Sequence, residues 1–436
     1  MVALLAAFAA TYLVFGGRAH GGRGFVSHRL FFAFGLLYYQ LLPLAALWIL
    51  RDTGDQTLQI WVRLGSSALA YRREEYSVDI LMWVIAFGTA SALTSRVKVE
   101  LPYTPSPSRA LIALFPILAI FMAMQMLANR HLVLQSYASI FEGESAQRGP
   151  LLSACLTAAI GTAWWFADRR HGSAKSRWQS AWLALWALSA VFVLAIGSRL
   201  YVITSGVILL AVQFGARRVP TRVFLLGVPS VALLFAGIGA IRYGLAGASS
   251  ESVLIGLVSE PIYTCFSLFD YLRLPDSPQW FHLPSFDVLA AFTLNILPTA
   301  LWPGKLTILA EASDRVGGAI SPFGALNAYV SFTAFFGRAG SWILCGILGA
   351  IGGLLERQRV PLGRVMYGAF CALLPFSLFR DPLYASIFKY LIQFVFILPL
   401  SIVAIDCLIN HANELVRRRF PDRVTGSNDS DLAVPR

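Results

Sequence analysis

The chain has 436 residues, of which 57 % are hydrophobic and 13 % are charged, and its mean hydropathy is +0.65. Because a soluble domain carries about 25 % charged residues, this composition excludes an ordinary soluble protein and indicates a polytopic membrane protein. The net charge of +12 resides mainly in short loops between apolar runs, where it orients a membrane protein, so nucleic acid is not expected as a partner. The runs lack the alternation of β-barrel strands, which predicts an all-α helical bundle.

In chain order, the apolar runs predict about eleven transmembrane helices, within a range of roughly ten to twelve. A further run, 286–302, contains Pro298, which disrupts a straight helix, and we expect an interfacial or re-entrant helix there. The first run has neither a basic segment before it nor a cleavage site, so we expect a membrane span and not a signal peptide. The predicted spans lie near 1–15, 30–50, 79–95, 110–128, 151–167, 179–197, 200–216, 222–241, 340–355, 365–379 and 385–408.

Lysine and arginine are distributed unequally between the two sets of loops that alternate along the chain. The richer set includes Arg96, Arg169, Arg217 and Arg357. Since such loops stay in the cytoplasm, the N-terminus is predicted to be periplasmic and the C-terminus cytoplasmic. Outer loops are expected at 51–78, at 129–150 and, by far the longest, at about 242–339. We predict one integral membrane domain over 1–408 and a largely disordered cytoplasmic tail over 409–436.

Arginines stand at the ends of apolar runs on the face predicted to be outside, at Arg199, Arg242 and Arg380. Charge at the membrane edge is energetically costly, so such residues are functional candidates, and Lys389 in the last span is a fourth. A guanidinium binds phosphate through paired charge-assisted hydrogen bonds, and together the four cations predict a pyrophosphate site. The alternative is that each arginine anchors its helix at the interface, with Asp381 as an ion-pair partner of Arg380.

Two residues of the long outer loop are candidates for a general base. Glu260 interrupts an apolar stretch, and apolar surroundings make a carboxylate a stronger base. The alternative for Glu260 is an acid at a helix N-terminus, beside Pro261 in the first turn. His282 is the rival base. Paired histidines are missing, and the five cysteines lack paired spacing, so we predict neither a metal nor a cofactor.

Glycines mark two further features of the second half. Gly317–Gly324 is a glycine-rich turn, but it lacks the lysine and hydroxyl residue that complete a phosphate-binding P-loop. Further on, Gly349 and Gly353 stand four residues apart in an apolar run, which predicts a helix that packs closely against a neighbour.

Three stretches of the second half carry a resemblance to a known family. Ile196–Arg199 contains Gly-x-Arg and leads directly into a span. Gly317–Gly340 combines a glycine turn, a tyrosine and Phe-Gly-x-x-Gly before a small-residue helix, and Leu378–Lys389 is an arginine-led final helix. On these residues, and on the long outer loop, the chain resembles Wzy-type oligosaccharide repeat-unit polymerases, the bacterial O-antigen and exopolysaccharide polymerase family, over roughly residues 180–408.

This resemblance implies a GT-C-like glycosyltransferase architecture in the bacterial inner membrane. The implied enzyme is metal-independent and transfers undecaprenyl-pyrophosphate-linked repeat units onto one another at the periplasmic face. Its partners are the lipid-linked oligosaccharide and membrane lipid, with a chain-length regulator and a flippase as further expected partners. Two alternatives stay open: an O-antigen ligase, and a transporter or flippase for an anionic glycolipid.

The family often has an acid shortly before the tyrosine, where this chain has Asn327. Because this chain lacks that acid, Glu260 and His282 gain weight as the catalytic candidates. The predicted substrate-binding residues are Arg199, Arg242, Arg380, Lys389, Tyr329 and Arg338.

Overall fold

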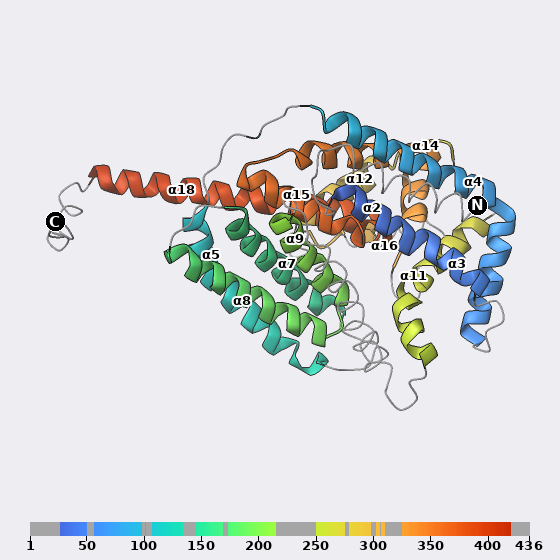
Figure 1. Ribbon diagram of the computed structural model, residues 1–436, viewed down its shortest axis with the longest axis horizontal. Helices are drawn as coiled ribbons and strands as arrows, with labels where there is room; N and C mark the ends of the chain where they lie inside the picture. The colour runs from blue at the N-terminus through green and yellow to red at the C-terminus, as the bar shows by residue number, and fades with distance from the viewer. Residues whose placement is uncertain are drawn as a thin grey trace.

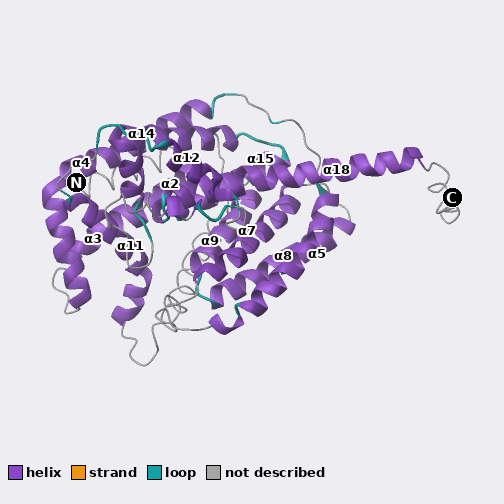
Figure 2. Ribbon diagram, turned by 180° about the vertical axis from the view of Figure 1, so that it is seen from behind, coloured by secondary structure: helices purple, strands orange, loops and turns teal. Residues whose placement is uncertain are grey.

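The computed structural model describes residues 27–49, 56–97, 101, 107–133, 145–168, 173–214, 250–274, 279–297, 302–305, 307–309 and 325–419. In this part of the chain the regular elements are all helices (Figure 2). Seven of the described helices are long and apolar enough to cross a membrane, so the protein is a multi-pass helical membrane protein. The predicted spans 1–15 and 222–241, residue Arg242, the turn Gly317–Gly324 and the tail beyond Arg419 lie outside the described residues.

The first half of the described chain contains seven α-helices, a π-helix (η1) and a 3-10 helix (η2) (Figure 1). They are α2 (His28–Leu36), η1 (Leu37–Leu41), α3 (Leu42–Ile49), α4 (Gln56–Thr94), α5 (Ser108–Ala128), η2 (Arg130–Leu132), α7 (Ser145–Ala167), α8 (Ser173–Ala195) and α9 (Arg199–Phe214). The second half begins with α11 (Ser250–Arg273), α12 (Phe286–Thr293) and the 3-10 helix η3 (Leu294–Ile296). It continues with α14 (Ala328–Glu356), α15 (Pro361–Leu373), α16 (Ser377–Arg380), α17 (Leu383–Ala385), the π-helix η4 (Ser386–Ile397) and α18 (Leu398–Arg419).

Two of the predicted outer loops contain helices in the part that the structure describes, and this corrects the sequence-based boundaries. The predicted loop 51–78 contains the first part of α4, which is kinked at Arg72 (φ −133°). The predicted loop 242–339 contains α11 and α12, and α14 already begins at Ala328. Hydropathy detects apolar runs, so helices with a mixed polar surface are read as loops. The apolar helical segment Phe286–Ile296 is shorter than the roughly 17 residues that a membrane span needs.

Close packing of α4 against α14 organises one side of the bundle (Figure 1). A Cβ atom added to Gly349 would lie 2.2 Å from the carbonyl oxygen of Phe87, and one added to Gly353 would lie 2.5 Å from that of Ser91. Only glycine permits such backbone contact, which confirms the predicted small-residue packing. The indole of Trp83 on α4 also donates a hydrogen bond of 2.8 Å to the hydroxyl of Ser341 on α14.

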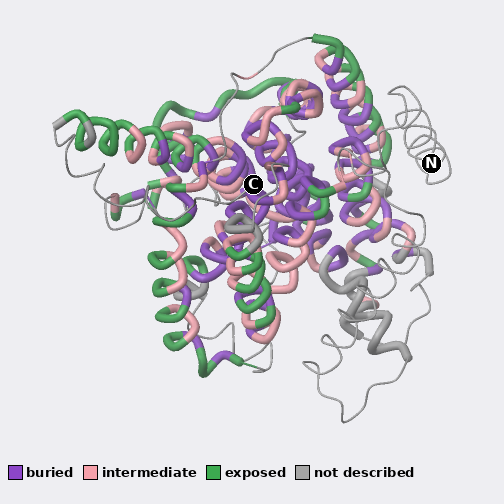
Figure 3. Tube along the Cα trace, turned by 60° about the vertical axis from the view of Figure 1, so that its left-hand side comes forward, coloured by how far each residue is buried: buried purple, intermediate pink, exposed green. Residues whose placement is uncertain are grey.

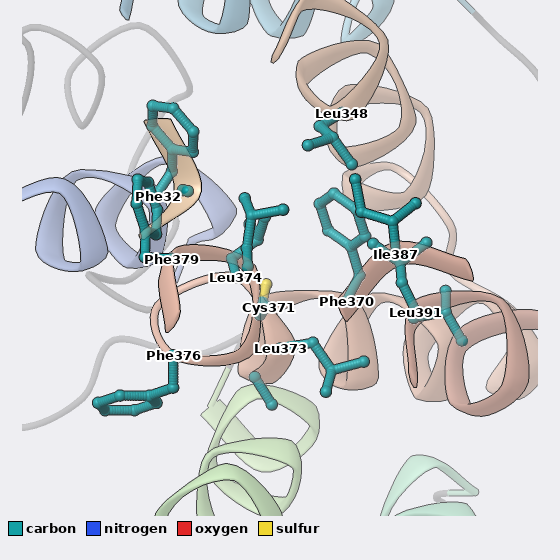
Figure 4. Packing of buried hydrophobic residues seen from close by; sticks show 14 of the residues in the cluster. Phe32, Leu348, Phe370, Cys371, Leu373, Leu374, Phe376, Phe379, Ile387 and Leu391 are labelled. Atoms are coloured by element: carbon teal, nitrogen blue, oxygen red, sulfur yellow. The ribbon is translucent and has the colours of Figure 1, made fainter. Parts of the chain in front are cut away.

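Figure 3 shows the buried residues gathered toward the centre of the molecule. Helix α15 belongs to this core, because most of its residues are buried, while several other helices expose large apolar side chains. Figure 4 shows Phe370 and Leu373 of α15 among buried side chains from α2, α14 and η4. Outward faces of α5 and α8, by contrast, carry large apolar side chains that are 61–66 % exposed, as lipid-facing surfaces do. They are Ile117, Met124, Leu188 and Val191.

Contacts between remote residues bring several of the arginine-rich loops to one end of the bundle. Arg357 donates a hydrogen bond of 3.2 Å to the carbonyl oxygen of Arg96. Arg364 donates to the carbonyl oxygens of Ala167 and Val212, at 2.7 and 2.8 Å. The ends of α4, α7, α9 and α14 that adjoin these loops therefore lie together, and the start of α9 lies at the opposite end.

Candidate functional site

Three helix ends meet where α9 begins. The hydroxyl groups of Tyr201 on α9 and Tyr390 on η4 lie 2.6 Å apart and share a hydrogen bond. Arg199 opens α9 two residues before Tyr201, and Lys389 directly precedes Tyr390. Arg380 ends α16, just before the chain turns into α17. The structure therefore brings Arg199, Arg380 and Lys389 to the same end of the bundle.

Arg380 is held by the residue that follows it. Its Nη1 atom lies 3.0 Å from Oδ1 of Asp381, the ion pair that the adjacent charges predict. Ser377 donates a hydrogen bond of 2.9 Å to the other carboxylate oxygen, and the carbonyl oxygen of Arg380 accepts one of 2.7 Å from the amide of Leu326. Both charged side chains are partly exposed, at 27 % for Arg380 and 13 % for Asp381. The guanidinium is thus fixed in place and still accessible.

A second lysine, which the sequence does not single out, joins this end of the bundle. Lys305 is only 4 % exposed, and its ammonium group donates hydrogen bonds to the carbonyl oxygens of Asn295, at 3.2 Å, and Leu297. Burial, and in second place the charge of Lys389, lowers the pKa of Lys305. Neither lysine forms an ion pair with a carboxylate in the part of the chain that the structure describes.

We define the residues Arg199, Lys305, Arg380 and Lys389 as the cation cluster. An aromatic side chain adjoins it, since the ring centroid of Tyr390 lies 5.8 Å from Nζ of Lys389. The long π-helix η4 carries Lys389 and Tyr390, and π-helical geometry is frequent at functional sites. An electropositive group of this kind attracts an anion, and the attraction is stronger where a side chain is buried, as that of Lys305 is.

Two other predicted site residues, Tyr329 and Arg338, belong to a separate buried cluster around Asp79. The Asp79 side chain is fully buried and accepts hydrogen bonds from Tyr329 Oη at 2.8 Å and from Trp342 Nε1 at 3.1 Å. Nε of Arg338 lies 3.1 and 3.0 Å from its two carboxylate oxygens. Tyr329 is therefore part of the framework that holds Arg338. The sequence does not single out Asp79, because this residue stands at the predicted boundary between loop and span.

Asn327, two residues before Tyr329, is a buried helix cap. Its side-chain oxygen accepts the backbone amide of Tyr329 at 2.9 Å and the amide group of Gln40 at 3.0 Å. Gln40 lies in the π-helix η1 and in turn accepts a hydrogen bond of 2.8 Å from Tyr76. A carboxamide has no basic oxygen, so Asn327 fixes the start of α14 and performs no acid–base chemistry.

The two candidate bases differ in how far the structure describes them. Glu260 lies within α11, well after its start at Ser250, so its interpretation as a helix N-terminal acid is wrong. Its side chain lies outside the described residues. His282 is exposed, and its backbone amide donates a hydrogen bond of 3.0 Å to the carbonyl oxygen of Phe336. That contact puts His282 beside the Arg338 cluster.

Comparison of the chain with protein-family models, curated proteins and solved structures gave no match. Function therefore rests on the chemistry of the cation cluster, on the cluster around Asp79 and on the resemblance of the short motifs.

Proposed function

We propose that this protein is a metal-independent membrane glycosyltransferase that joins oligosaccharide repeat units carried on undecaprenyl pyrophosphate. The observation that carries the proposal is the meeting of Arg380, Lys389 and the buried Lys305 at the end of the bundle where α9 begins. In the proposed orientation this end faces the periplasm, because several arginine-rich loops meet at the opposite end and such loops stay in the cytoplasm.

In the proposed reaction, a sugar hydroxyl of the incoming repeat unit attacks the anomeric carbon of the donor. The bond between that carbon and the pyrophosphate oxygen breaks, and the pyrophosphate leaves with the bonding electron pair. The proton of the attacking hydroxyl passes to a base, for which Glu260 and His282 are the candidates. The leaving group is already activated, so the reaction consumes no nucleotide.

Fixed cations supply the stabilisation that this leaving group needs. Negative charge grows on the pyrophosphate as the bond breaks, and preorganised donors then stabilise the transition state more than the ground state. Lys305 is preorganised by two carbonyl oxygens. An ammonium group has three N–H donors, so one remains for a ligand. Arg380 is similarly oriented by Asp381, which also reduces its net charge, so the two lysines are the stronger anion ligands.

An anion bound between the lysines also relieves their mutual repulsion. The charge of Lys389 contributes to the lowered pKa of Lys305, so the two ammonium groups are close enough to repel each other. A pyrophosphate turns this repulsion into attraction for both lysines. Substrate binding is therefore expected to stabilise the protein, and the lysine positions are expected to be sensitive to removal of either charge.

Genetic complementation tests this function. Cells that lack the chromosomal copy are supplied with the wild-type chain or with Arg199→Ala, Lys305→Met or Lys389→Ala, and their lipopolysaccharide is separated on a gel. A polymerase predicts that the variants yield lipid A-core with a single repeat unit. The exposed Arg130→Ala is the matched control and retains the full ladder.

Other outcomes point to the alternatives. Loss of all attached polymer, with long lipid-linked chains accumulating, identifies a ligase. Loss of repeat units from the periplasmic face, with unpolymerised units retained in the cytoplasmic leaflet, identifies a flippase. A full-length ladder from Lys389→Ala at normal expression contradicts the role of the cation cluster.

A further inference from the structure

Trp280 is an exposed aromatic residue that is nevertheless held rigidly. The residue is 61 % exposed. The backbone carbonyl oxygen of Trp280 accepts a hydrogen bond of 2.9 Å from the backbone amide of Ala339. The carbonyl oxygen of Gln279, one residue earlier, accepts one of 3.0 Å from the backbone amide of Arg338. The segment that carries Trp280 is thus hydrogen-bonded onto the kink of α14.

Gly337 makes this contact possible. Its φ of +72° is a left-handed conformation that favours glycine, and it kinks α14. A Cβ atom at this position would lie 2.6 Å from the carbonyl oxygen of Gln279. The Phe-Gly-x-x-Gly pattern therefore encodes the fixed position of Trp280 beside the helix.

A charged donor lies next to the indole. The guanidinium carbon of Arg338 lies 5.9 Å from the ring centroid of Trp280, and Trp342 meets Trp280 edge to face at 5.1 Å. Nε of Arg338 is bound by Asp79. Its two Nη groups form no hydrogen bond with any residue that the structure describes. With respect to the described residues, four of the five N–H donors of this guanidinium are therefore available to a ligand.

We propose that Trp280 and Arg338 form a saccharide-binding platform. The apolar face of a pyranose ring stacks on the indole, and ring hydroxyl or carboxylate oxygens accept hydrogen bonds from the Nη groups. An acyl chain is a poorer occupant, because it has no acceptor for these donors. A phosphate headgroup would engage Arg338 but would make no use of the indole face.

This inference rests on the proposed function, because it assigns the platform to the oligosaccharide of the same substrate class. The segment from Leu326 to Arg338 joins the two sites: the amide of Leu326 binds the carbonyl of Arg380, and Ser331 accepts the amide of Leu383. The helical turns 328–336 between them are about 13 Å long at 1.5 Å per residue. A short oligosaccharide is therefore long enough to extend from the platform to the cation cluster. The exposed His282 lies two residues after Trp280 in the chain.

The test uses the full-length chain in lipid nanodiscs and two probes. The first probe is an array of bacterial surface oligosaccharides, on which the best-bound glycan is chosen and its Kd measured. The second is inorganic pyrophosphate. Trp280→Ala is expected to weaken glycan binding about tenfold, in line with the loss of one aromatic contact and of the donor alignment beside it. Trp280→Tyr restores most of the affinity, and pyrophosphate binding is unchanged in both variants.

Phe286→Ala is the matched control, since Phe286 is an 83 % exposed aromatic residue nearby on α12; it leaves glycan binding unchanged. Failure of the wild-type chain to bind any glycan, or equal glycan Kd values for Trp280→Ala and wild type, overturns the platform. So does a Trp280→Ala chain that only associates less well with the bilayer, which identifies a membrane anchor. Glycan binding without any pyrophosphate binding overturns the proposed function and leaves the platform intact.

Discussion

Replacement of Asp79 by asparagine tests the buried cluster that fixes Arg338. The carboxylate accepts hydrogen bonds from Tyr329, Arg338 and Trp342, at 2.8 to 3.1 Å. Asparagine has nearly the same shape but only one acceptor oxygen, and its NH₂ group would face at least one of these donors. The substitution therefore removes the charge and leaves a donor facing a donor in a fully buried position.

The expected loss of stability follows from the burial of the two partners. Breaking a buried ion pair by removing one partner costs about 3–5 kcal/mol. The Arg338 side chain is 18 % exposed, so water relieves part of the penalty, whereas Asp79 is fully buried. We therefore expect Asp79→Asn to lower the free energy of unfolding by about 3 kcal/mol, the lower end of this range.

The free energy of unfolding is measured by denaturant titration in mixed micelles. A double-mutant cycle with Arg338→Met isolates the pair, and a coupling of about 1–3 kcal/mol is expected for contacting residues. Asp270→Asn is the control; Asp270 is exposed on α11, and the change is expected to stay within about 0.5 kcal/mol. An equally small effect of Asp79→Asn, or strictly additive effects in the cycle, would refute the proposed lock on Arg338.

Three further predictions address packing, charge and the tyrosine pair. Gly349→Ala places a Cβ atom 2.2 Å from a carbonyl oxygen of α4 and is expected to cost about 1–3 kcal/mol in thermal unfolding, whereas Gly346→Ala, with its nearest neighbour at 3.9 Å, is close to neutral. Because the pKa of Lys305 is lowered, this lysine loses its proton at a lower pH than an ordinary lysine. Affinity for inorganic pyrophosphate is therefore expected to fall as pH rises toward that range, and Lys305→Arg, which keeps its charge, should flatten the fall; parallel profiles would contradict this. Tyr201→Phe removes the 2.6 Å contact to Tyr390 and is expected to cost about 1 kcal/mol of stability, with Tyr390→Phe adding little in the same chain; full additivity of the two changes would count against a shared hydrogen bond.

The sequence predicts the helical membrane class because apolar runs report directly on the solvent around them. It also predicts that Arg199 and Arg380 lie at the same end, since helices that cross the bundle in succession alternate in direction. The close approach of Gly349 to α4 is similarly foreseeable, because small residues at a four-residue spacing allow helix backbones to touch.

Such sequence patterns do not predict which residues far apart in the chain contact each other. Asp79 and Arg338 meet across 259 positions, and Tyr201 and Tyr390 across 189, which local periodicity does not encode. The role of Lys305 is hidden from the sequence for a related reason. A single lysine after a turn resembles a surface residue until the fold buries it against the carbonyl oxygens of Asn295 and Leu297.

The reaction itself is tested most directly by reconstitution. The purified chain is placed in liposomes with oligosaccharide-linked undecaprenyl pyrophosphate and no other protein, and the lipid-linked products are analysed by mass spectrometry. We predict carriers that bear two or more repeat units, with one undecaprenyl pyrophosphate released for each linkage formed, and loss of both products in Lys389→Ala. Unchanged single repeat units with active wild-type protein, or their movement across the bilayer without linkage, would contradict the proposed function.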